Sequence, residues 1–314
     1  MADSKAAGGA DLDRLLAETS RTFALSIPVL PEPTRREVTI AYLLFRIADT
    51  FEDASHWSVS ARTDALARFS DLLRNPSAPE ARRLAREWTA ARPSSHEGYL
   101  ALVAEVPMVL DAFLALSPRA VEPIREHVVR SAEGMADFVR RTDAAGQLVL
   151  ADLPDLRRYC YFVAGVVGEM LTELFLLGRD SLARVAPQLR PRASLFGEAL
   201  QLVNILRDAG GDAAEGRRYL PEGVSSADVF ALARRDLGSA AEYIAALQSA
   251  GAPRGILAFT ALPVELAWAT LERVEAEGPG AKVSRLQVGA IVAALDRRLS
   301  KGEPAVRPRL TPAG

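Results

Sequence analysis

The stretch YLLFRIADTFEDA, residues 42–54, places three acidic residues directly after an apolar run. Asp49 and Asp53 are four residues apart and Glu52 lies between them, so on a helix the three carboxylates share one face. Like charges at this spacing repel each other, and charged residues seldom enter a buried segment without a partner. The stretch therefore predicts a helix whose carboxylates either face solvent or bind a strongly cationic group.

A second acidic pair ends another apolar helix. Asp208 and Asp212 are again four residues apart and follow FGEALQLVNIL (196–206), with Arg207 and Arg218 close by. Carboxylates at this spacing suit Mg²⁺, which takes a few carboxylates together with waters and phosphate oxygens. Arginines suit the phosphate itself, by paired hydrogen bonds. One such motif is usually a solvated helix face. Two of them, each next to a long apolar helix, could face one another across a cavity, and together they predict a site for a magnesium-bound diphosphate.

The composition excludes several classes of protein. The 314 residues include 38 basic and 40 acidic side chains, a net charge of −2, so no basic surplus indicates nucleic-acid binding. A single cysteine, Cys160, excludes a disulfide framework, and the three histidines match no zinc spacing. The most apolar window (161–178) contains Glu169 and Glu173, so we expect a buried helix rather than a membrane span. The N-terminus has no signal-peptide core, and we expect a cytoplasmic protein.

Helical periodicity is nearly continuous, and no stretch alternates apolar and polar residues as a hairpin would. We expect one all-α domain over residues 10–300, with a disordered leader over 1–9 and a Pro-rich tail over 301–314. Prolines such as Pro187 and Pro191 are expected at the joints between helices. Expected helical segments lie at 11–25, 61–75, 98–115, 119–141, 155–178, 194–209, 226–236, 239–249, 254–276 and 283–299, and a further helix starts within PEPTRREV (31–38).

Four motifs, in order along the chain, resemble those of the squalene and phytoene synthases. The two aspartate-rich motifs of that family resemble DTFED (49–53) and NILRDAGGD (204–212), the latter followed by GRRYLP (216–221). Its N-terminal and central signatures resemble SRTFA (20–24) and YCYFVAGVVG (159–168). The resemblance implies a head-to-head prenyl transferase with a single-domain isoprenoid synthase fold, an all-α bundle around a central apolar cavity.

The resemblance also implies a role for each matching residue. Magnesium ions would be held by Asp49, Glu52, Asp53, Asp208 and Asp212. The diphosphate would be met by Ser20, Arg21, Arg46, Arg207 and Arg218, and the reacting centre would be lined by Tyr42, Tyr159, Gln201 and Asn204, with Phe23 beside the prenyl chain. Gly211 stands where many members carry an acid, but both aspartates of the second motif are kept. Gly165 and Gly168 could admit either a ligand or a neighbouring helix.

Several activities are compatible with the resemblance. A squalene synthase joins two farnesyl diphosphates through presqualene diphosphate and reduces the product with NADPH, whereas a phytoene or dehydrosqualene synthase loses a proton and needs no NADPH. The wording of YLLFRIADTFED and GMADFV (134–139) is closer to the squalene branch, where Lys282 and Arg285 would contact a nicotinamide phosphate. No Gly-rich dinucleotide fingerprint accompanies them.

Other outcomes stay open at this point. The reaction could stop at presqualene diphosphate or give a hydroxylated product. The chain could instead be a non-catalytic helical binding protein of the same fold, although such a protein would be expected to lose aspartates that this sequence keeps. We expect prenyl diphosphate as the partner and no nucleic acid. Peripheral contact with the inner membrane face for product release is a further option, and the oligomeric state is left open.

Overall fold

The structure is a computed structural model of the chain. It describes residues 2–20, 23–142, 148–214, 219–307 and 309, and the side chains of 2–8 and 210–214 lie outside the description. Within these residues every regular element is helical, apart from one isolated bridge between Thr142 and Leu148, which confirms the predicted all-α class. The predicted domain limits at residues 10 and 300 stay a prediction. Contacts within the chain group it into two compact units: unit 1 is Met1–Pro28 with Glu32–Arg141, and unit 2 is Val29–Pro31 with Thr142–Gly314.

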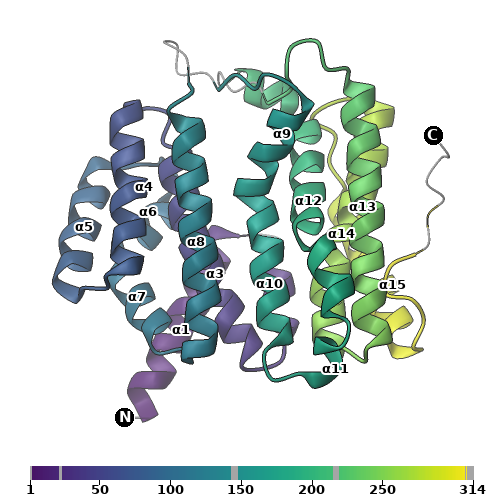
Figure 1. Ribbon diagram of the computed structural model, residues 1–314, viewed down its shortest axis with the longest axis horizontal. Helices are drawn as coiled ribbons and strands as arrows, with labels where there is room; N and C mark the ends of the chain where they lie inside the picture. The colour runs from purple at the N-terminus through teal and green to yellow at the C-terminus, as the bar shows by residue number, and fades with distance from the viewer. Residues whose placement is uncertain (1, 21–22, 143–147, 215–218, 308, 310–314) are drawn as a thin grey trace. The chain divides into compact units, whose positions relative to one another are not determined.

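Unit 1 is built around one helix, α3, which packs against α1, α4, α6, α7 and α8. Leu43, Leu44, Ile47 and Phe51 are the fully buried face of α3. The helix α1 begins at Ala2 and so includes residues 2–9, for which the sequence predicts a disordered leader. The helices are α1 (Ala2–Thr19), α2 (Phe23–Ser26), the short 3₁₀ turn η1 (Ile27–Val29), α3 (Thr34–Glu52), α4 (Val59–Arg74), α5 (Ala78–Ala91), α6 (Glu97–Ala104), α7 (Val106–Leu114) and α8 (Pro118–Val139) (Figure 1).

Local sequence sets several of these helix boundaries. Ser58, Ser77 and Ser117 precede α4, α5 and α8, and each side chain accepts a hydrogen bond from a backbone N–H of the first turn. The single helix predicted over 98–115 is two helices, because the chain turns at Glu105 and restarts with Pro107 in the first turn of α7. The helix α5 is absent from the predicted segments; Pro76 precedes it and Pro79 lies in its first turn, where a proline is compatible with a helix.

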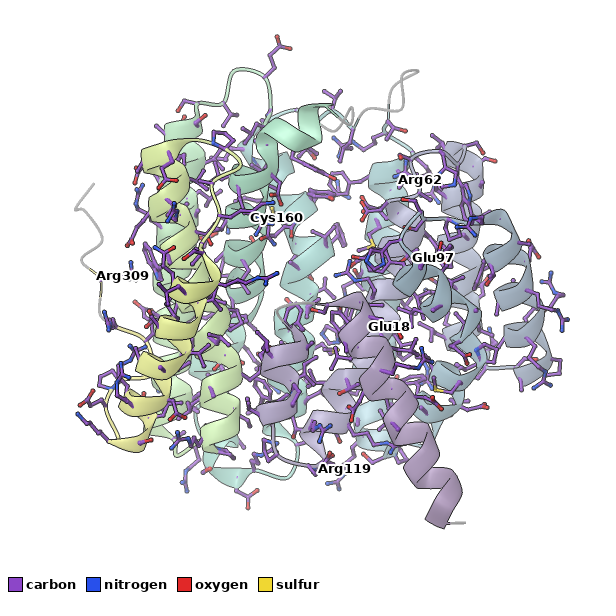
Figure 2. All side chains as sticks on the ribbon, turned by 180° about the vertical axis from the view of Figure 1, so that it is seen from behind. Glu18, Arg62, Glu97, Arg119, Cys160 and Arg309 are labelled. Atoms are coloured by element: carbon purple, nitrogen blue, oxygen red, sulfur yellow. The ribbon has the colours of Figure 1, made fainter. Side chains whose placement is uncertain are left out.

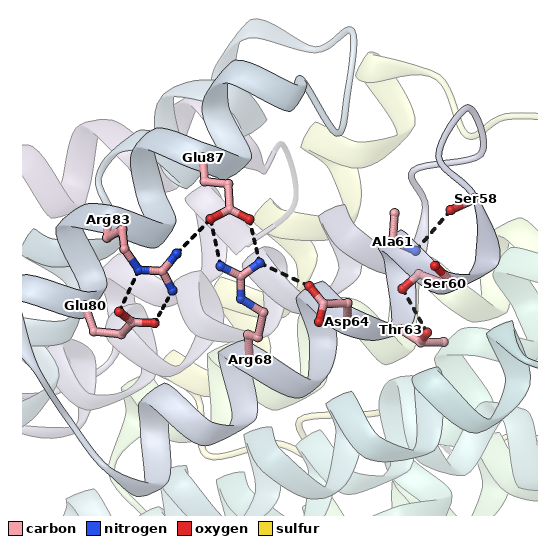
Figure 3. Close-up of polar contacts among 9 residues, drawn as sticks. All are labelled: Ser58, Ser60, Ala61, Thr63, Asp64, Arg68, Glu80, Arg83 and Glu87. Atoms are coloured by element: carbon pink, nitrogen blue, oxygen red, sulfur yellow. Dashed lines mark hydrogen bonds and ion pairs between the residues drawn. The ribbon is translucent and has the colours of Figure 1, made fainter.

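An ion-pair network links α4 to α5 at the surface of unit 1 (Figure 3). Arg68 binds both carboxylate oxygens of Glu87 at 2.5 and 2.7 Å and also contacts Asp64, while Arg83 joins Glu80 to Glu87. Exposed pairs of this kind contribute little net stability. The attachment of α5 therefore depends on its buried face, where the Trp88 ring lies 4.6 Å from that of Phe51 on α3.

Unit 2 is built around the long helix α12, which packs against α9, η2, α10, α13 and α14. Pro187 and Pro191 lie inside α12 rather than at a joint: Pro187 falls in the first turn, where no backbone N–H is needed, and Pro191 costs one hydrogen bond. The helices are α9 (Leu153–Cys160), the π-helical turn η2 (Tyr161–Gly165), α10 (Val166–Leu176), α11 (Asp180–Ala183), α12 (Ala186–Ala214), α13 (Ser226–Ser249), α14 (Arg254–Glu277) and α15 (Arg285–Ser300) (Figure 1). The segments predicted at 226–236 and 239–249 form one helix, α13.

Glycines bring the backbones of two helices of unit 2 into contact. A Cβ atom added to Gly168 would lie 1.9 Å from the carbonyl oxygen of Ala193, and one added to Gly197 would lie 1.9 Å from that of Ala164. The run η2–α10 and the helix α12 therefore touch along their main chains. Of the two alternatives left open for Gly168, the structure supports helix–helix packing.

Two further features of unit 2 bear on the sequence expectations. Cys160 lies among the helices (Figure 2), is fully buried, and has its thiol pKa raised by burial and by the nearby acids Glu198 and Asp236, as expected for a core residue. The segments Leu153–Leu176 and Arg254–Glu277 are long and apolar enough to cross a membrane, yet 56% and 72% of their apolar windows are buried inside the protein. Buried core helices pass the same test of length and composition.

Substituting Gly168 by alanine should strongly destabilise the protein. Because the new methyl group would overlap a backbone carbonyl, the two helices would have to separate, and we expect the free energy of unfolding to fall by about 3 kcal/mol. Urea denaturation followed by circular dichroism measures this. The matched control is Gly238→Ala on α13, where nothing lies within 4 Å of the added Cβ; it should leave stability unchanged or raise it by up to about 1 kcal/mol. Equal stability of the two variants would contradict the packing argument.

Candidate active site

The N-terminal motif of unit 1 is fastened to α3 through Tyr42. The Ser20 hydroxyl accepts a hydrogen bond from the Phe23 backbone N–H at 2.9 Å and so begins α2. The Phe23 ring lies 5.4 Å from the Tyr42 ring, and the Tyr42 hydroxyl donates to the Thr19 carbonyl oxygen at 2.9 Å. Three of the predicted site residues, Ser20, Phe23 and Tyr42, are thus brought together. Arg21 lies outside the described residues.

Arg46 stands one turn beyond Tyr42 and is held by several groups. Its guanidinium lies 3.3 Å from Asp49, and its Nε lies 3.4 Å from the Tyr42 hydroxyl. The guanidinium carbon is 5.7 Å from the centre of the Tyr42 ring and 5.3 Å from that of Tyr99, both within cation–π range. Burial alone would lower the pKa of Arg46. The effects of Asp49 and the two tyrosines are together larger, so the pKa is raised and the guanidinium stays protonated.

The three acids of α3 differ in environment. Burial raises the pKa of Asp49 to about 6, with the Asp53 charge adding to the shift and Arg46 opposing it. Glu52 is 8% exposed, whereas Asp53, at the helix end, is exposed. Arg62 of α4, labelled in Figure 2, donates to the Glu52 carbonyl oxygen and so complements the negative end of the helix dipole.

The donor set of α3 fits a divalent cation. The pKa of Asp49 is raised by burial and by the neighbouring Asp53 carboxylate. A bound Mg²⁺ would offset the negative charge of both carboxylates. Mg²⁺ takes only one or two protein carboxylates and completes its shell with waters and phosphate oxygens. Within the side chains that the structure describes, no three His, Cys, Asp or Glu groups converge to form a metal site. The full set of five magnesium ligands therefore stays a prediction, as does the idea that the two clusters face each other.

In unit 2 the second motif occupies the end of α12. Gln201, Asn204 and Asp208 follow one another at helical spacing and share a face. Arg207 binds both oxygens of Asp208, with Nε 2.8 Å from Oδ1. Asp212 lies one turn further on in the same helix, its side chain outside the description, and Arg218 lies outside the described residues.

Three other predicted residues of unit 2, Tyr159, Lys282 and Arg285, lie on neighbouring segments. Tyr159, in the last turn of α9, is 3% exposed, and its ring stacks on Tyr219 at 5.1 Å. The backbone N–H of Gly280 donates to the Arg207 carbonyl oxygen at 2.7 Å, which attaches the segment between α14 and α15 to α12. Lys282 follows in that segment and Arg285 begins α15; both side chains are exposed.

The arrangement of these motifs can now be compared with known proteins. The family model for squalene/phytoene synthase matches residues 16–229. The chain belongs to the squalene/phytoene synthase family. It is 31% identical over 227 residues to the squalene synthase of Eremothecium gossypii, a match that covers 70% of this chain and 48% of that protein. The chain thus spans about half the length of the curated relatives it matches.

Solved structures of squalene/phytoene synthases share the fold. TcSQS bound to the ligand E5700 has a TM-score of 0.72 and 24% identity, covering 93% of this chain and 89% of that one. A dehydrosqualene synthase in complex with a ligand has a TM-score of 0.61 and 20% identity, covering 95% and 99%. These similarities confirm the isoprenoid synthase fold that the motifs predict.

The motifs of the squalene/phytoene synthase family do not include every residue that bears on the site. Tyr99, which contacts Arg46, belongs to no quoted motif, and only the structure shows it. In unit 2, Glu198 and Asp236 form a buried acidic pair whose pKa values are raised by burial, and Arg157 lies 3.4 Å from Glu198. The signal for this pair was a single charge, Glu198, inside an apolar run.

Removing the Asp49 charge should stabilise the metal-free protein at neutral and alkaline pH, where Asp49 is ionised. The raised pKa means that ionising Asp49 costs more in the folded protein than in the unfolded chain, so its contribution to stability is lost as the pH rises from about 4 to about 6. Asp49→Asn should therefore raise the free energy of unfolding by about 1–3 kcal/mol at pH 8 and by much less at pH 4. Thermal and urea unfolding with a chelator present measures this.

The control for this experiment is Asp53→Asn. Asp53 is exposed, so its substitution should change the free energy of unfolding by less than that of Asp49 at either pH. The explanation fails if Asp49→Asn has the same effect at pH 4 and pH 8, or if it destabilises the protein at pH 8.

Proposed function

We propose that this protein is a squalene synthase, which condenses two farnesyl diphosphates head to head through presqualene diphosphate and reduces the product to squalene with NADPH. The observation that carries the proposal is Arg46, held beside Asp49 and next to the SRTFA motif, in a chain of the squalene/phytoene synthase family. A fixed guanidinium beside carboxylates is the combination that a metal-bound diphosphate leaving group requires.

Binding of the diphosphate would fall to the arginines and to Ser20. Arg46 and Arg207 would donate hydrogen bonds to its oxygens, together with Arg21 and Arg218. Asp49, Glu52 and Asp53 on α3, and Asp208 and Asp212 on α12, would hold magnesium, which when bound neutralises the charge on the leaving diphosphate. Tyr42 already donates its proton to the Thr19 carbonyl oxygen, so its hydroxyl oxygen serves to orient Arg46.

Loss of the first diphosphate leaves an allylic cation. The double bond of the second farnesyl chain attacks it, a proton leaves, and a cyclopropylcarbinyl diphosphate results. Tyr159 is buried and stacked on Tyr219, so its ring face would stabilise the cation or its hydroxyl would take part in the proton transfer. Gln201, Asn204 and Phe23 would line the reacting chains, and exclusion of water would prevent capture of the cation as an alcohol.

The reductive half of the reaction requires NADPH, which supplies a hydride when bound. Lys282 and Arg285 would contact its phosphate; the hydrogen bond between Gly280 and Arg207 supports this, because it ties their segment to the second motif. The second candidate is a dehydrosqualene or phytoene synthase, which needs no NADPH. The family model covers squalene and phytoene synthases alike, so it supports this candidate as well. A cytoplasmic enzyme that touches the membrane to release its apolar product fits either activity.

Product analysis tests the proposal directly. Purified protein with Mg²⁺ receives farnesyl or geranylgeranyl diphosphate, each with and without NADPH, and extracts are examined by gas chromatography–mass spectrometry. We expect squalene only when farnesyl diphosphate and NADPH are both present. Dehydrosqualene or phytoene formed equally well without NADPH would identify the second candidate. No coupled product under any condition would favour a non-catalytic protein of this fold.

The assignment of Lys282 and Arg285 has its own test. If they bind the cofactor phosphate, Lys282→Ala and Arg285→Ala should each raise the KM for NADPH about tenfold or more, as expected for a lost charge-assisted hydrogen bond. The KM for farnesyl diphosphate should change less. Lys301→Ala, an exposed lysine just beyond α15, is the matched control. An unchanged KM for NADPH in both variants would remove these residues from the cofactor site.

A further inference from the structure

Tyr99 is brought to Arg46 by a close contact between two helices of unit 1. The start of α6 packs against the end of α1, and a Cβ atom added to Gly98 would lie 2.6 Å from the carbonyl oxygen of Glu18. Figure 2 shows Glu18 and Glu97 where these helix ends meet. A glycine at position 98 permits this approach, and the next residue is Tyr99. The same end of α1 supplies the Thr19 carbonyl that accepts the Tyr42 proton.

The Tyr99 ring is itself supported. It stacks on the His96 ring, with centroids 4.2 Å apart and an angle of 27° between the planes. The Arg46 guanidinium carbon lies 5.3 Å from its centre. Tyr99 is half-buried, so neighbouring residues pack against its ring and restrict its movement.

The contacts of Arg46 differ in where they come from. Tyr42 and Asp49 stand on α3 itself, one turn before Arg46 and one turn after it. They would move with Arg46 and leave its long side chain several rotamers along the helix surface. Tyr99 reaches the guanidinium from α6, so it fixes the guanidinium relative to a second element of unit 1.

We propose that Tyr99 is a positioning residue: its ring face holds the Arg46 guanidinium in the orientation in which it binds diphosphate oxygens. The inference rests on the proposed function in one respect, that Arg46 binds a diphosphate. A side chain ordered before binding loses less entropy when the ligand arrives, so the gain appears as affinity. The ring face is what matters, and the Tyr99 hydroxyl has no part in it.

Calorimetric titration with inorganic pyrophosphate in the presence of Mg²⁺ tests this without requiring turnover. Tyr99→Leu, which removes the ring, should weaken pyrophosphate binding about three- to thirtyfold, the range of a partly buried cation–π contact. Tyr99→Phe keeps the ring and should bind within about twofold of the unmodified protein. Tyr99→Met is a second ring-free variant of similar volume, used if the leucine protein does not fold. Thermal unfolding verifies that the variants compared are equally folded.

A double substitution separates positioning from general support of the fold. In an Arg46→Gln background, Tyr99→Leu should cause no further loss of pyrophosphate affinity, because the group that it positions is gone. The inference is overturned if Tyr99→Leu and Tyr99→Met bind normally, if Tyr99→Phe loses as much as they do, or if the loss persists in the Arg46→Gln background. It also falls if the unmodified protein binds no pyrophosphate. Normal pyrophosphate binding without any coupled prenyl product would instead refute the proposed function and leave the role of Tyr99 standing.

Discussion

The structure of unit 1 depends on α3, which has a buried apolar face and a second face that carries charged residues. One face, with Leu44, Ile47 and Phe51, is the centre of the core, and the other helices of the unit gather round it. The other face bears Arg46 and Asp49, which the same packing leaves only partly exposed to water. The charges are therefore held at fixed positions by the burial of the apolar face, and their own pairing adds little to the stability of the unit.

The charged face of α3 lowers the stability of the folded protein. The pKa of Asp49 is raised to about 6, so its ionised form is less stable in the folded protein than in the unfolded chain. The neighbouring Asp53 charge adds to this effect. A ligand that binds the folded protein and offsets this charge returns stability by mass action. Strain of this kind is typical of functional sites, where the best residues for binding are poor residues for packing.

Sequence patterns predicted the features that depend on local spacing. Helical periodicity and the acid pairs gave the all-α class, the acid-bearing helices and the start of α3. Features that depend on contacts between distant segments were not accessible. Tyr99 meets Arg46 only because α6 returns to α3, and no spacing in the sequence reports this. Pro191 lies inside a helix where local rules predict a joint, because packing of α12 on its neighbours outweighs one missing hydrogen bond. The π-helical turn η2 likewise has no signal in the periodicity of its residues.

The main-chain contact at Gly168 and Gly197 has a consequence for how this chain can change. Two helices whose backbones touch cannot rotate about their axes independently, since rotation would bring a residue with a Cβ atom into the contact that the glycine leaves open. Tyr159, in the last turn of α9 just before the run η2–α10, and Gln201, on α12, are therefore held in a fixed relation within unit 2. For the prenyl substrates proposed above, a fit to a longer or shorter chain would therefore not come from a change in the angle between these helices. It must come from exchanging the side chains that project from them, one at a time, on a scaffold that stays the same.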